Sequence, residues 1–558
     1  MENKNFIETI IDQDIKNGLD PEALCFRFPP EPNGFLHIGH VKAIVLNFEL
    51  AKKYKKAKVN LRFDDTNPEK EDQKYIDAIK DNIKWLGYSW NKECYASDYF
   101  NQLYEWACML IKSGKAYIDS QTSDQIALQK GAPTVAGQES PYRRRSKEEN
   151  LLIFNSMKEG KCRPGEHVLR AKIDMRSPNM LMRDPIIYRV LNSEHPRTKK
   201  KWVIFPMYDW THGESDYIEQ ITHSLCTLEF KPHRELYDWF LNQIVEKGKI
   251  RPKQREFARL NLSHTITSKR KLLFLVEEGI VSGWDDPRMP TISGLKRRGY
   301  TPEALKKFVT AAGVAKRENV IEMSLLEFYI REELNQTCNR MMVVHEPIKL
   351  TITNLPKDYE EELLVENNPE DSSFGKRKIK LTRSIFIEKE DFMEDPPKKF
   401  FRLSIGAEVR LKGAYIIKAN KVNYKNNGEI DEVYCTYDQK SRSGSGTEES
   451  MRRVKGTLHW VSSTTNVPVV IREYDRLFIH SSPGQFKTEE LYRIINPNSA
   501  TVRNGYAEQE IGKAKEGDLF QFQRKGYYIV DKDSTDKQLV FNKTVSLRDN
   551  WKKINKNN

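Results

Sequence analysis

The sequence predicts a mixed α/β protein built from a parallel-sheet domain, an inserted domain, a helical connector and two C-terminal β-barrels. Strand and helix patterns alternate in the N-terminal third, which is typical of βαβ units. Beyond Pro347 only short strand patterns separated by turns follow, which is typical of all-β barrels. The length of 558 residues allows about three to five domains at roughly 100–200 residues each.

The N-terminal third predicts the start of a parallel sheet. A strand is expected over residues 24–28, a helix over 37–54 and a second strand over 59–63. Residues 66–69 combine a cap residue, a proline and an acidic residue, and predict that the next helix begins there. Residues 1–20 are amphipathic and predict a further helix. This order is typical of a Rossmann-like, nucleotide-binding sheet.

The alternation is interrupted in the middle of the chain. Residues 98–201 are irregular and include a stretch rich in Gly, Pro and Gln at 131–141, which predicts an inserted domain. Residues 284–335 have helical patterns, and Pro302 and Gly313 mark the start and end of one helix. The predicted domains are a first catalytic half (1–97), the insertion (98–201), a second catalytic half (202–262), a loop with a helical connector (263–340) and the two β-barrels (341–558).

The C-terminal region predicts short strands. Pro468 is placed just before one of them, where a strand tolerates proline. The segment 440–450 is rich in Ser and Gly and predicts a mobile loop. The expected strands are 348–352, 408–411, 469–472 and 538–541.

Composition limits the possible functions. The chain has 92 Lys+Arg and 79 Asp+Glu, a net charge of +13, which favours a polyanionic partner. Mean hydropathy is −0.70 and no apolar run approaches the ~20 residues that span a bilayer, which argues against a membrane protein. The seven cysteines contain no C-x-x-C pair, so we expect no disulfide framework and no zinc site, as suits a reducing cytoplasm.

The loop at residues 29–36 stands between a predicted strand and a predicted helix, where phosphates bind. It leads into His37, Gly39 and His40. The two histidines share one helix face and can donate hydrogen bonds to a triphosphate, while Gly39 allows close approach to the backbone. The alternative is a pair of capping or core histidines.

A polar, basic loop at residues 267–271 follows much later in the chain. Its Lys269 could stabilise the charge that grows on a leaving pyrophosphate. Alone, such a loop is more simply a solvated basic turn, but its pairing with the histidine loop favours a nucleotide site.

Taken together, several segments resemble the class I aminoacyl-tRNA synthetases, and among them the glutaminyl-tRNA synthetases of bacterial length. The resemblance extends over nearly the whole chain. The matching segments are 27–34, 37–40, 61–68, 206–209, 222–230, 284–294 and the β region.

The resemblance implies an enzyme that joins L-glutamine to tRNA(Gln) in two steps. ATP and glutamine form an adenylate and pyrophosphate, and the terminal ribose of the tRNA then takes the amino acid. It also implies Mg²⁺ with the ATP, a monomer in the cytoplasm without membrane contact, and activation that requires bound tRNA. Residues 98–201 would bind the acceptor stem, and the two barrels would bind the anticodon.

The resemblance also implies roles for individual residues. Asp64 would hold the ammonium of glutamine, Tyr208 would face its side chain, and Arg27 would meet its carboxylate. From the residues alone, Asp64 could be only a turn that caps a helix, and Tyr208 a core tyrosine. His37, His40 and Lys269 would be catalytic, and the ATP site would comprise Glu31, Pro32, Asn33, His37, Ile38, Gly39, His40, Val41, Lys42, Ala43, Thr227, Arg259, Leu260, Thr267, Ser268 and Lys269.

Cys226 separates glutamine from glutamate in this interpretation. Glutamyl relatives tend to carry an arginine at the matching place, where a fixed cation pairs with a substrate carboxylate. A neutral cysteine removes that attraction. A glutamyl-tRNA synthetase is one rival hypothesis, and a tRNA-binding protein that has lost catalysis is the other.

The anticodon contacts of the family fall on polar side chains of the β region. Arginine forks and a glutamine amide can read splayed bases, whereas a solvated strand face is the alternative. The matching residues are Arg340, Arg402, Arg410, Gln521 and Arg524.

Three departures from the family pattern concern the site. Thr267 replaces a methionine of the signature loop, which affects the fit of the loop but not its lysine. Residues 213–215 and Tyr217 change the helix after His212, and residues 231–233 replace an amide- or acid-containing run. The last two departures concern details of the substrate pocket and of acceptor-stem contacts.

Overall fold

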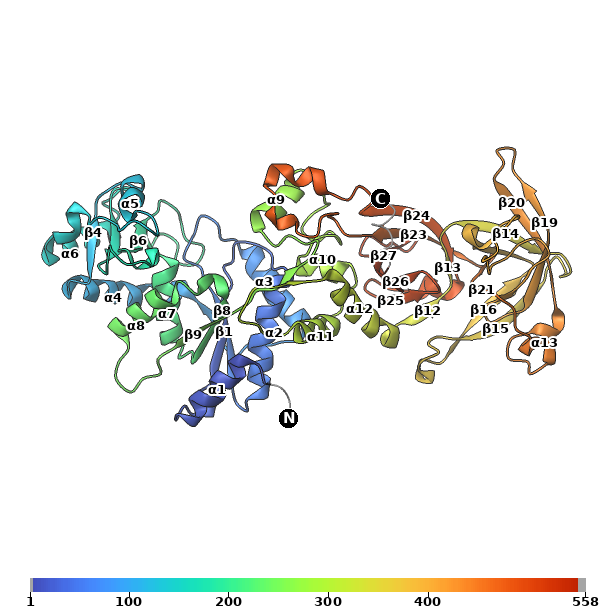
Figure 1. Cartoon of the computed structure of the whole chain (residues 1–558), viewed down its shortest axis with the longest axis horizontal. Helices are drawn as coiled ribbons and strands as arrows, with labels where there is room; N and C mark the ends of the chain where they lie inside the picture. Colours follow the sequence, from blue (N-terminus) through green and yellow to red (C-terminus); the bar gives the residue numbers. More distant parts are fainter. Residues whose placement is uncertain (1–3, 550–558) are drawn as a thin grey trace. The chain divides into compact units, whose positions relative to one another are not determined.

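The computed structural model describes residues 4–549 and divides the chain into two compact units (Figure 1). The first unit comprises residues 1–261 and 309–321, and the second comprises 262–308 and 322–558. Within the described part of the chain, no helix has the length and apolar character needed to cross a membrane. The prediction over residues 1–3 and part of the prediction for the last barrel (550–558) lie outside the described residues.

A parallel β-sheet with covering helices forms the start of the first unit. Strand β1 (Cys25–Phe28) pairs in parallel with β2 (Lys58–Phe63), and β2 pairs in parallel with β3 (Glu93–Tyr95). Helix α2 (Ile38–Lys53) connects β1 and β2. The βαβ prediction is therefore confirmed. A second parallel pair comprises β8 (His223–Thr227) and β9 (Lys253–Phe257).

Two helices of this unit can be compared with the helix starts that the sequence predicts. Helix α1 (Phe6–Lys16) is present, with Asn5 as its N-cap. Helix α3 (Gln73–Trp85) begins later than predicted, because Asp72 and not residue 66 or 67 caps it. The intervening turn is held locally, since the N–H of Asn67 donates to the Glu71 carboxylate at 2.6 Å. The cap residue and proline that predicted a helix start at residues 66–69 therefore form a turn that precedes the helix.

The region predicted as an insertion (98–201) contains most of an antiparallel sheet with the order β4-β5-β6-β7. The sheet extends beyond the predicted boundary at residue 201, because its last strand, Ile204–Pro206, pairs with β6. Its core packs around Phe154, Tyr188 and Trp202. The strands are β4 (Ala116–Asp119), β5 (Val168–Ala171), β6 (Ile186–Val190) and β7 (Ile204–Pro206), and the helices of the region are α4 (Phe100–Lys112), α5 (Ser123–Lys130) and α6 (Lys147–Lys158). Strand β7 leads into α7 (Tyr208–Ile218), which is followed after β8 by α8 (Arg234–Ile244).

Short helices connect this part of the chain to the β region. Pro302 begins α11 (Pro302–Ala312), and Gly313 follows it with φ +70°, as predicted. In that conformation glycine costs less than other residues. The remaining elements of the segment are β10 (Asn261–Leu262), α9 (Lys269–Glu277), α10 (Ile292–Arg297), β11 (Val320–Ile321) and α12 (Met323–Thr337).

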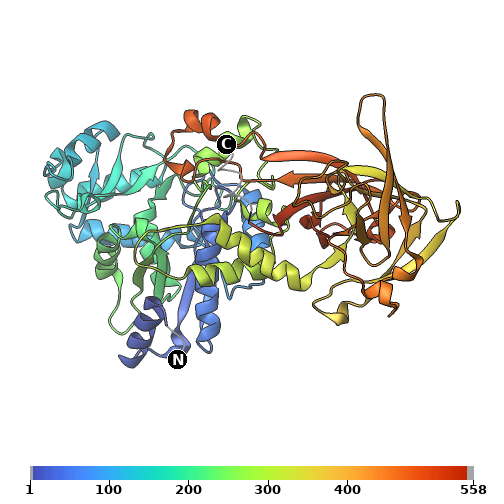
Figure 2. The same ribbon diagram turned by 45° about the vertical axis from the view of Figure 1, so that its right-hand side comes forward.

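Two seven-stranded, barrel-like sheets make up most of the second unit. One has the order β12-β25-β26-β27-β23-β24-β13 and the other β21-β18-β19-β20-β14-β17-β22. The β19–β20 hairpin, orange in Figures 1 and 2, extends beyond the body of its sheet. The strands are β12 (Asn339–Met341), β13 (Val343–Val344), β14 (Pro347–Ile352), β15 (Glu360–Glu366), β16 (Lys376–Thr382), β17 (Ser384–Glu388), β18 (Glu408–Leu411), β19 (Ile416–Tyr424), β20 (Ile430–Tyr437), β21 (Thr457–Leu458), β22 (Val461–Ser462), β23 (Val467–Tyr474), β24 (Ala500–Ala507), β25 (Leu519–Phe522), β26 (Gly526–Val530) and β27 (Leu539–Ser546), with helix α13 (Glu448–Met451) between β20 and β21.

The β region corrects two local predictions. Pro468 lies inside β23, paired with Tyr506, and not before it. Strand β27 joins β23 only from Val469 onward, so no ladder bond from that side is lost at the proline. The segment 440–450 is also more ordered than predicted, because it contains the end of a short 3₁₀ turn and most of α13 and is tied to Arg410.

Candidate functional site

The loop before α2 ends in two histidines that cap the helix reciprocally. The N–H of Gly39 donates to His37 Nδ1 at 3.1 Å, and the N–H of His37 donates to His40 Nδ1 at 3.1 Å. These bonds satisfy donors at the helix start that otherwise lack partners. The two ring centroids lie 4.0 Å apart. The helix start is therefore fixed before any ligand arrives.

The same bonds set the protonation of both rings. A nitrogen that accepts an N–H carries no proton, so the neutral rings carry theirs on Nε2. Burial lowers the pKa of His40 to about 4, and burial together with His40 lowers the pKa of His37 well below its usual range. Within residues 4–549 neither Nε2 makes a hydrogen bond. Both histidines can thus donate to a phosphate as neutral N–H dipoles.

Gly39 is required by the geometry of this cap. A Cβ at this position would lie 2.9 Å from His37 Cε1 and 4.0 Å from the Leu260 carbonyl oxygen. The first distance is shorter than carbon atoms tolerate. The position also brings the backbone of residue 260 close to the loop, as expected for one ATP site.

The other residues predicted to bind ATP differ in what they can offer. The side chains of Ile38, Val41 and Leu260 are in the core, so only their backbones can meet a nucleotide. Lys42 is buried and donates to the Ala258 carbonyl oxygen at 2.7 Å. The remaining members in this unit are Glu31, which accepts a bond from Asn33; buried Pro32; partly exposed Ala43 and Thr227; and Arg259, which pairs with Glu229 and donates to Asn261.

Asp64 stands at the carboxyl end of β2, next to the histidine loop. Its N–H donates to the Pro30 carbonyl oxygen at 3.1 Å. The side chain is buried, and its Oδ1 has no hydrogen-bond partner. Burial and the nearby Glu31 raise the pKa of Asp64 to about 7. A buried, unpartnered carboxylate oxygen has the chemistry to accept an ammonium.

Tyr208 is the first residue of α7, and Cys226 lies in β8. The Tyr208 ring is stacked 5.0 Å from His212, and its hydroxyl makes no hydrogen bond within the described residues. Burial, then Asp64 and Cys226, raise the pKa of Tyr208 well above its usual range. Burial raises the pKa of the Cys226 thiol to about 12. Both groups are therefore neutral at pH 7.

Arg27, which is predicted to meet the carboxylate of glutamine, is bonded to groups of the protein. Its guanidinium is fully buried, with Nε 3.0 Å from Asp216, Nη1 2.7 Å from the Leu225 carbonyl oxygen and Nη2 2.7 Å from Ser224. Although burial alone would raise it, Arg27 and Arg62 hold the pKa of Asp216 well below its usual range. Arg27 is thus committed to the interior, and contact with a substrate carboxylate would require one of these bonds to be exchanged.

The predicted signature loop belongs to the second unit. Ser268 precedes α9 as its N-cap residue, and Lys269 is the first residue of that helix. Both are exposed, and Thr267 is partly exposed. The meeting of Lys269 with the histidine loop remains a prediction.

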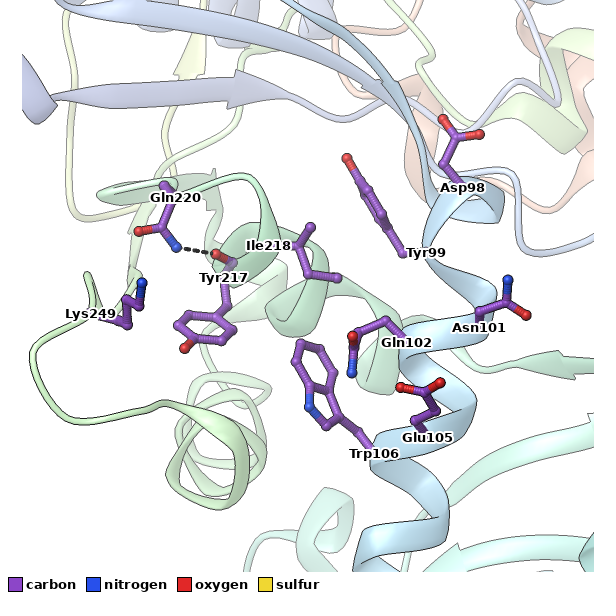
Figure 3. Close-up of a pocket in the computed structure, with 10 residues that line it drawn as sticks. All are labelled: Asp98, Tyr99, Asn101, Gln102, Glu105, Trp106, Tyr217, Ile218, Gln220 and Lys249. Carbon is purple, nitrogen blue, oxygen red and sulfur yellow. Dashed lines mark hydrogen bonds between the residues drawn. The ribbon is translucent and has the colours of Figure 1, made fainter.

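A groove of about 380 Å³ on the first unit lies apart from these residues (Figure 3). It runs between α4 and the end of α7, and Trp106 and Tyr217 project into it. Its lining includes none of the residues predicted for catalysis or substrate binding. Within residues 4–549, no group of three or more His, Cys, Asp or Glu side chains is placed to hold a metal ion.

Comparison with known proteins decides the family. The family model "tRNA synthetases class I (E and Q), catalytic domain" matches residues 23–336. Two models described as "tRNA synthetases class I (E and Q), anti-codon binding domain" match residues 338–438 and 457–531. The chain belongs to this family of class I tRNA synthetases.

Similar relatives carry one name. A "Glutamine–tRNA ligase" of Clostridium perfringens is 50% identical over 552 residues, covering 98% of both chains. One of Nitrosomonas europaea is 50% identical over 551 residues, covering 98% of this chain and 99% of its own. One of Clostridium kluyveri is 48% identical over 549 residues, covering 98% of both chains.

The departures in α7 of this class I synthetase have structural consequences. A Cβ on Gly213 would lie 3.1 Å from the ring of Tyr237, so glycine makes room for that ring. Glu214 is fully buried, and neither of its carboxyl oxygens has a hydrogen-bond partner. Burial raises the pKa of Glu214 well above its usual range. The carboxyl is thus held neutral in the core.

The residues predicted to read the anticodon are mostly paired within the protein. Arg410 donates to the carbonyl oxygens of Ser441 and Ser450 at 2.9 and 2.8 Å. Arg524 forms a two-bond fork with Asp391, both bonds 2.6 Å long. The other members behave similarly: Arg402 donates to the Glu390 carbonyl oxygen, Arg340 to Asn335, and Gln521 to Tyr527.

The sequence analysis missed residues that support the site. Asp216 neutralises Arg27, and Glu71 and His195 flank the loop that carries Asp64. A signal for Asp216 was available, because it follows His212 by four residues on one helix face. Glu71 and His195 lie far apart in the sequence and gave no such signal.

Proposed function

We propose that this protein attaches L-glutamine to tRNA(Gln) in two steps. The carboxylate of glutamine attacks the α-phosphate of ATP and releases pyrophosphate, and the terminal ribose hydroxyl of the tRNA then attacks the carbonyl of the adenylate. The observation that carries the proposal is the unpartnered Oδ1 of buried Asp64 beside the histidine loop. It provides one acceptor for the ammonium next to a site built for phosphates.

Catalysis in this proposal depends on positioning and on charge, since no side-chain nucleophile is required. His37 and His40 donate from Nε2 to phosphate oxygens, and Lys269 stabilises the leaving pyrophosphate. Mg²⁺ enters with the ATP phosphates, because it prefers oxygen ligands and is usually held in part by substrate phosphates. Activation is expected to require bound tRNA.

Selection of glutamine over glutamate follows from the charges around the side-chain pocket. A carboxylate would need a cation there, but Cys226 is neutral and Arg27 is already paired with Asp216. The Tyr208 hydroxyl remains available for the amide. The pocket therefore favours an uncharged side chain.

The wider setting is proposed on the same basis. The two barrels would hold the anticodon, and residues 98–201 would hold the acceptor stem. We expect the protein to act as a monomer in the cytoplasm. Sedimentation of the purified protein with and without tRNA tests whether it is a monomer.

ATP–pyrophosphate exchange tests the reaction directly. Purified protein is offered glutamine or glutamate, each with and without total tRNA. Exchange with glutamine only when tRNA is present is the expected result. Exchange with glutamate would place the protein on the glutamyl branch, and no exchange together with retained tRNA binding would make it a binding protein.

A charge substitution tests the specificity argument. Cys226→Arg adds a cation to the pocket and should shift the ratio of kcat/KM toward glutamate by about tenfold or more, as one charged hydrogen bond would. Cys226→Ser is the matched neutral control and should keep the preference for glutamine. Equal preference in the Arg and Ser variants would contradict the role of charge at this position.

A further inference from the structure

His195 occupies a buried junction in the first unit, in the loop between β6 and β7. Its Nδ1 accepts the N–H groups of Arg197 and Thr198, both at 3.1 Å. Its Nε2 lies 2.8 Å from the carbonyl oxygen of Asp65. Because Nδ1 accepts, the proton of the neutral ring is on Nε2, which donates to Asp65. One ring thus connects two loops.

The first of these loops is the one that carries the proposed ammonium acceptor. Asp65 directly follows Asp64, and its carboxylate accepts from the N–H and the hydroxyl of Ser97 at 2.8 and 2.6 Å. Glu71 closes the loop, and its Oε2 has no hydrogen-bond partner and lies 3.7 Å from His195 Nε2. The ring of His195 therefore helps to set the backbone from which the Asp64 side chain projects.

The second loop is a turn with an unusual concentration of positive charge. Residues 197–201 read Arg-Thr-Lys-Lys-Lys, and the last three lysines are exposed. In the described part of the chain no carboxylate lies within ion-pair distance of these three lysines, whereas Arg197 pairs with Asp98 at 2.8 Å. We call residues 197–201 the basic turn.

The basic turn is tightly built despite its exposure. The N–H of Lys199 donates to the His195 carbonyl oxygen at 2.9 Å, and the N–H of His195 donates back to the Lys199 carbonyl oxygen at 3.3 Å. Lys199 adopts φ +54°, a conformation that side chains other than glycine rarely occupy. Such strain persists only where surrounding bonds hold it, and here the ring of His195 supplies two of them.

We propose that the basic turn binds phosphates of the RNA substrate and that His195 is a positioning residue that couples this contact to the amino-acid loop. The proposal rests on the proposed function and deepens it. Three adjacent exposed lysines without acidic partners supply the sequence-independent positive charge that binds the phosphates of a polynucleotide. RNA bound there would stabilise the turn, the turn would hold the ring, and the ring would fix the Asp65 carbonyl and with it the direction of the Asp64 carboxylate.

The proposed coupling between RNA binding and glutamine binding can be measured, because thermodynamic linkage makes it reciprocal. If bound RNA strengthens glutamine binding through His195, glutamine strengthens RNA binding by the same factor. Loss of either bond of the ring should remove that factor without removing either binding site.

Two substitutions of His195 separate the two bonds. In His195→Asn the Oδ1 atom takes the place of Nδ1 and can still accept from the basic turn, but nothing reaches Asp65. In His195→Gln the Nε2 atom can still donate to Asp65, but the acceptor for the turn is lost. A third variant replaces Lys199, Lys200 and Lys201 by Gln.

Steady-state aminoacylation of the full chain, with glutamine and tRNA varied in turn, reads out the proposal. The triple lysine variant should raise KM for tRNA about tenfold and flatten its salt dependence. His195→Asn should raise KM for glutamine about tenfold, the loss expected for one hydrogen bond in a buried network. It should leave the affinity for tRNA unchanged when that affinity is measured without glutamine, because the coupling factor acts only when both ligands are bound. His195→Gln should raise KM for tRNA more than KM for glutamine.

The decisive experiment combines His195→Asn with the triple lysine variant. In the His195→Asn background, replacing the three lysines should have no further effect on KM for glutamine, whereas additive effects on that KM would overturn the coupling. An unchanged KM for tRNA in the lysine variant would overturn the phosphate contact. Thermal unfolding confirms that each variant is folded, and an inactive wild type would refute the proposed function instead of this inference.

Discussion

The residues proposed to bind the amino acid and ATP and those proposed to contact the anticodon differ in their existing hydrogen bonds. At the first, Asp64 Oδ1 has no partner and the two histidines keep Nε2 without a hydrogen bond within the described residues. At the second, Arg410 and Arg524 already bond to groups of the protein. If the predicted roles hold, the first site binds its ligands by filling open positions, whereas the second exchanges internal bonds for bonds to RNA.

The difference has an energetic meaning. An open, fixed group gives most of its interaction energy to the ligand, because no bond is broken first. An exchanged bond contributes only the difference between two partners. Residues of the first site should therefore show large and specific losses on substitution, and residues of the second smaller and more general ones.

The largest effect is expected at Lys269. Lys269→Ala should lower the rate of adenylate formation by about 10²–10³, as loss of one group that stabilises transition-state charge does. Binding of tRNA should remain nearly intact. Rapid-quench measurement of adenylate, together with filter binding of tRNA, checks both parts, and an unchanged rate would remove the lysine from the mechanism.

The pH dependence of glutamine binding tests whether the open carboxylate oxygen of Asp64 accepts the ammonium. Its pKa is raised to about 7, so below pH 7 the free carboxyl is increasingly protonated and cannot pair with an ammonium. KM for glutamine should rise about tenfold per pH unit below 7. Asp64→Asn should raise KM about a hundredfold, as loss of a buried charged hydrogen bond does, and abolish that slope. A slope that persists in the Asn variant would assign it to another group.

Arg410 tests the second half of the comparison with a smaller effect. Because it holds the carbonyl groups of the segment that ends at Arg452, Arg410→Ala should raise KM for tRNA about tenfold. If the arginine organises the segment, the loss should be the same for tRNAs with each anticodon base altered in turn. A loss confined to one altered base would show direct reading.

The smallest effect on activity is expected at Glu214, where a substitution should change stability instead. Glu214 is an unpartnered carboxyl in the core, and burial raises its pKa above the unfolded value. The folded state therefore holds a proton that the unfolded state releases, and stability falls as pH rises above about 4.5, by up to about 1.4 kcal/mol per pH unit. Glu214→Gln should stabilise the protein at pH 8 and have little effect at pH 4. Thermal unfolding at the two pH values measures this, with exposed Glu105→Gln as the control.

Local patterns predicted the elements better than they predicted the interactions between them. The first βαβ unit, the helix begun by Pro302 and the position of Asp64 at a strand end follow from periodicity and caps. The later start of α3 does not, because the Glu71 carboxylate takes the N–H of Asn67. The burial of Arg27 also could not be predicted, because its partner Asp216 lies 189 residues away.

The two anticodon-binding regions are not independent modules. Asp391 and Arg377 belong to the region matched at 338–438, while Arg524 and Glu508 belong to that matched at 457–531. Arg524 pairs with Asp391, which is fully buried, and Arg377 pairs with Glu508 at 3.0 Å. Grafting one region alone from a relative that lacks the matching charge would strand a buried ion without its partner. Exchange of these regions during evolution, or in a designed chimera, therefore requires both halves to be inherited together.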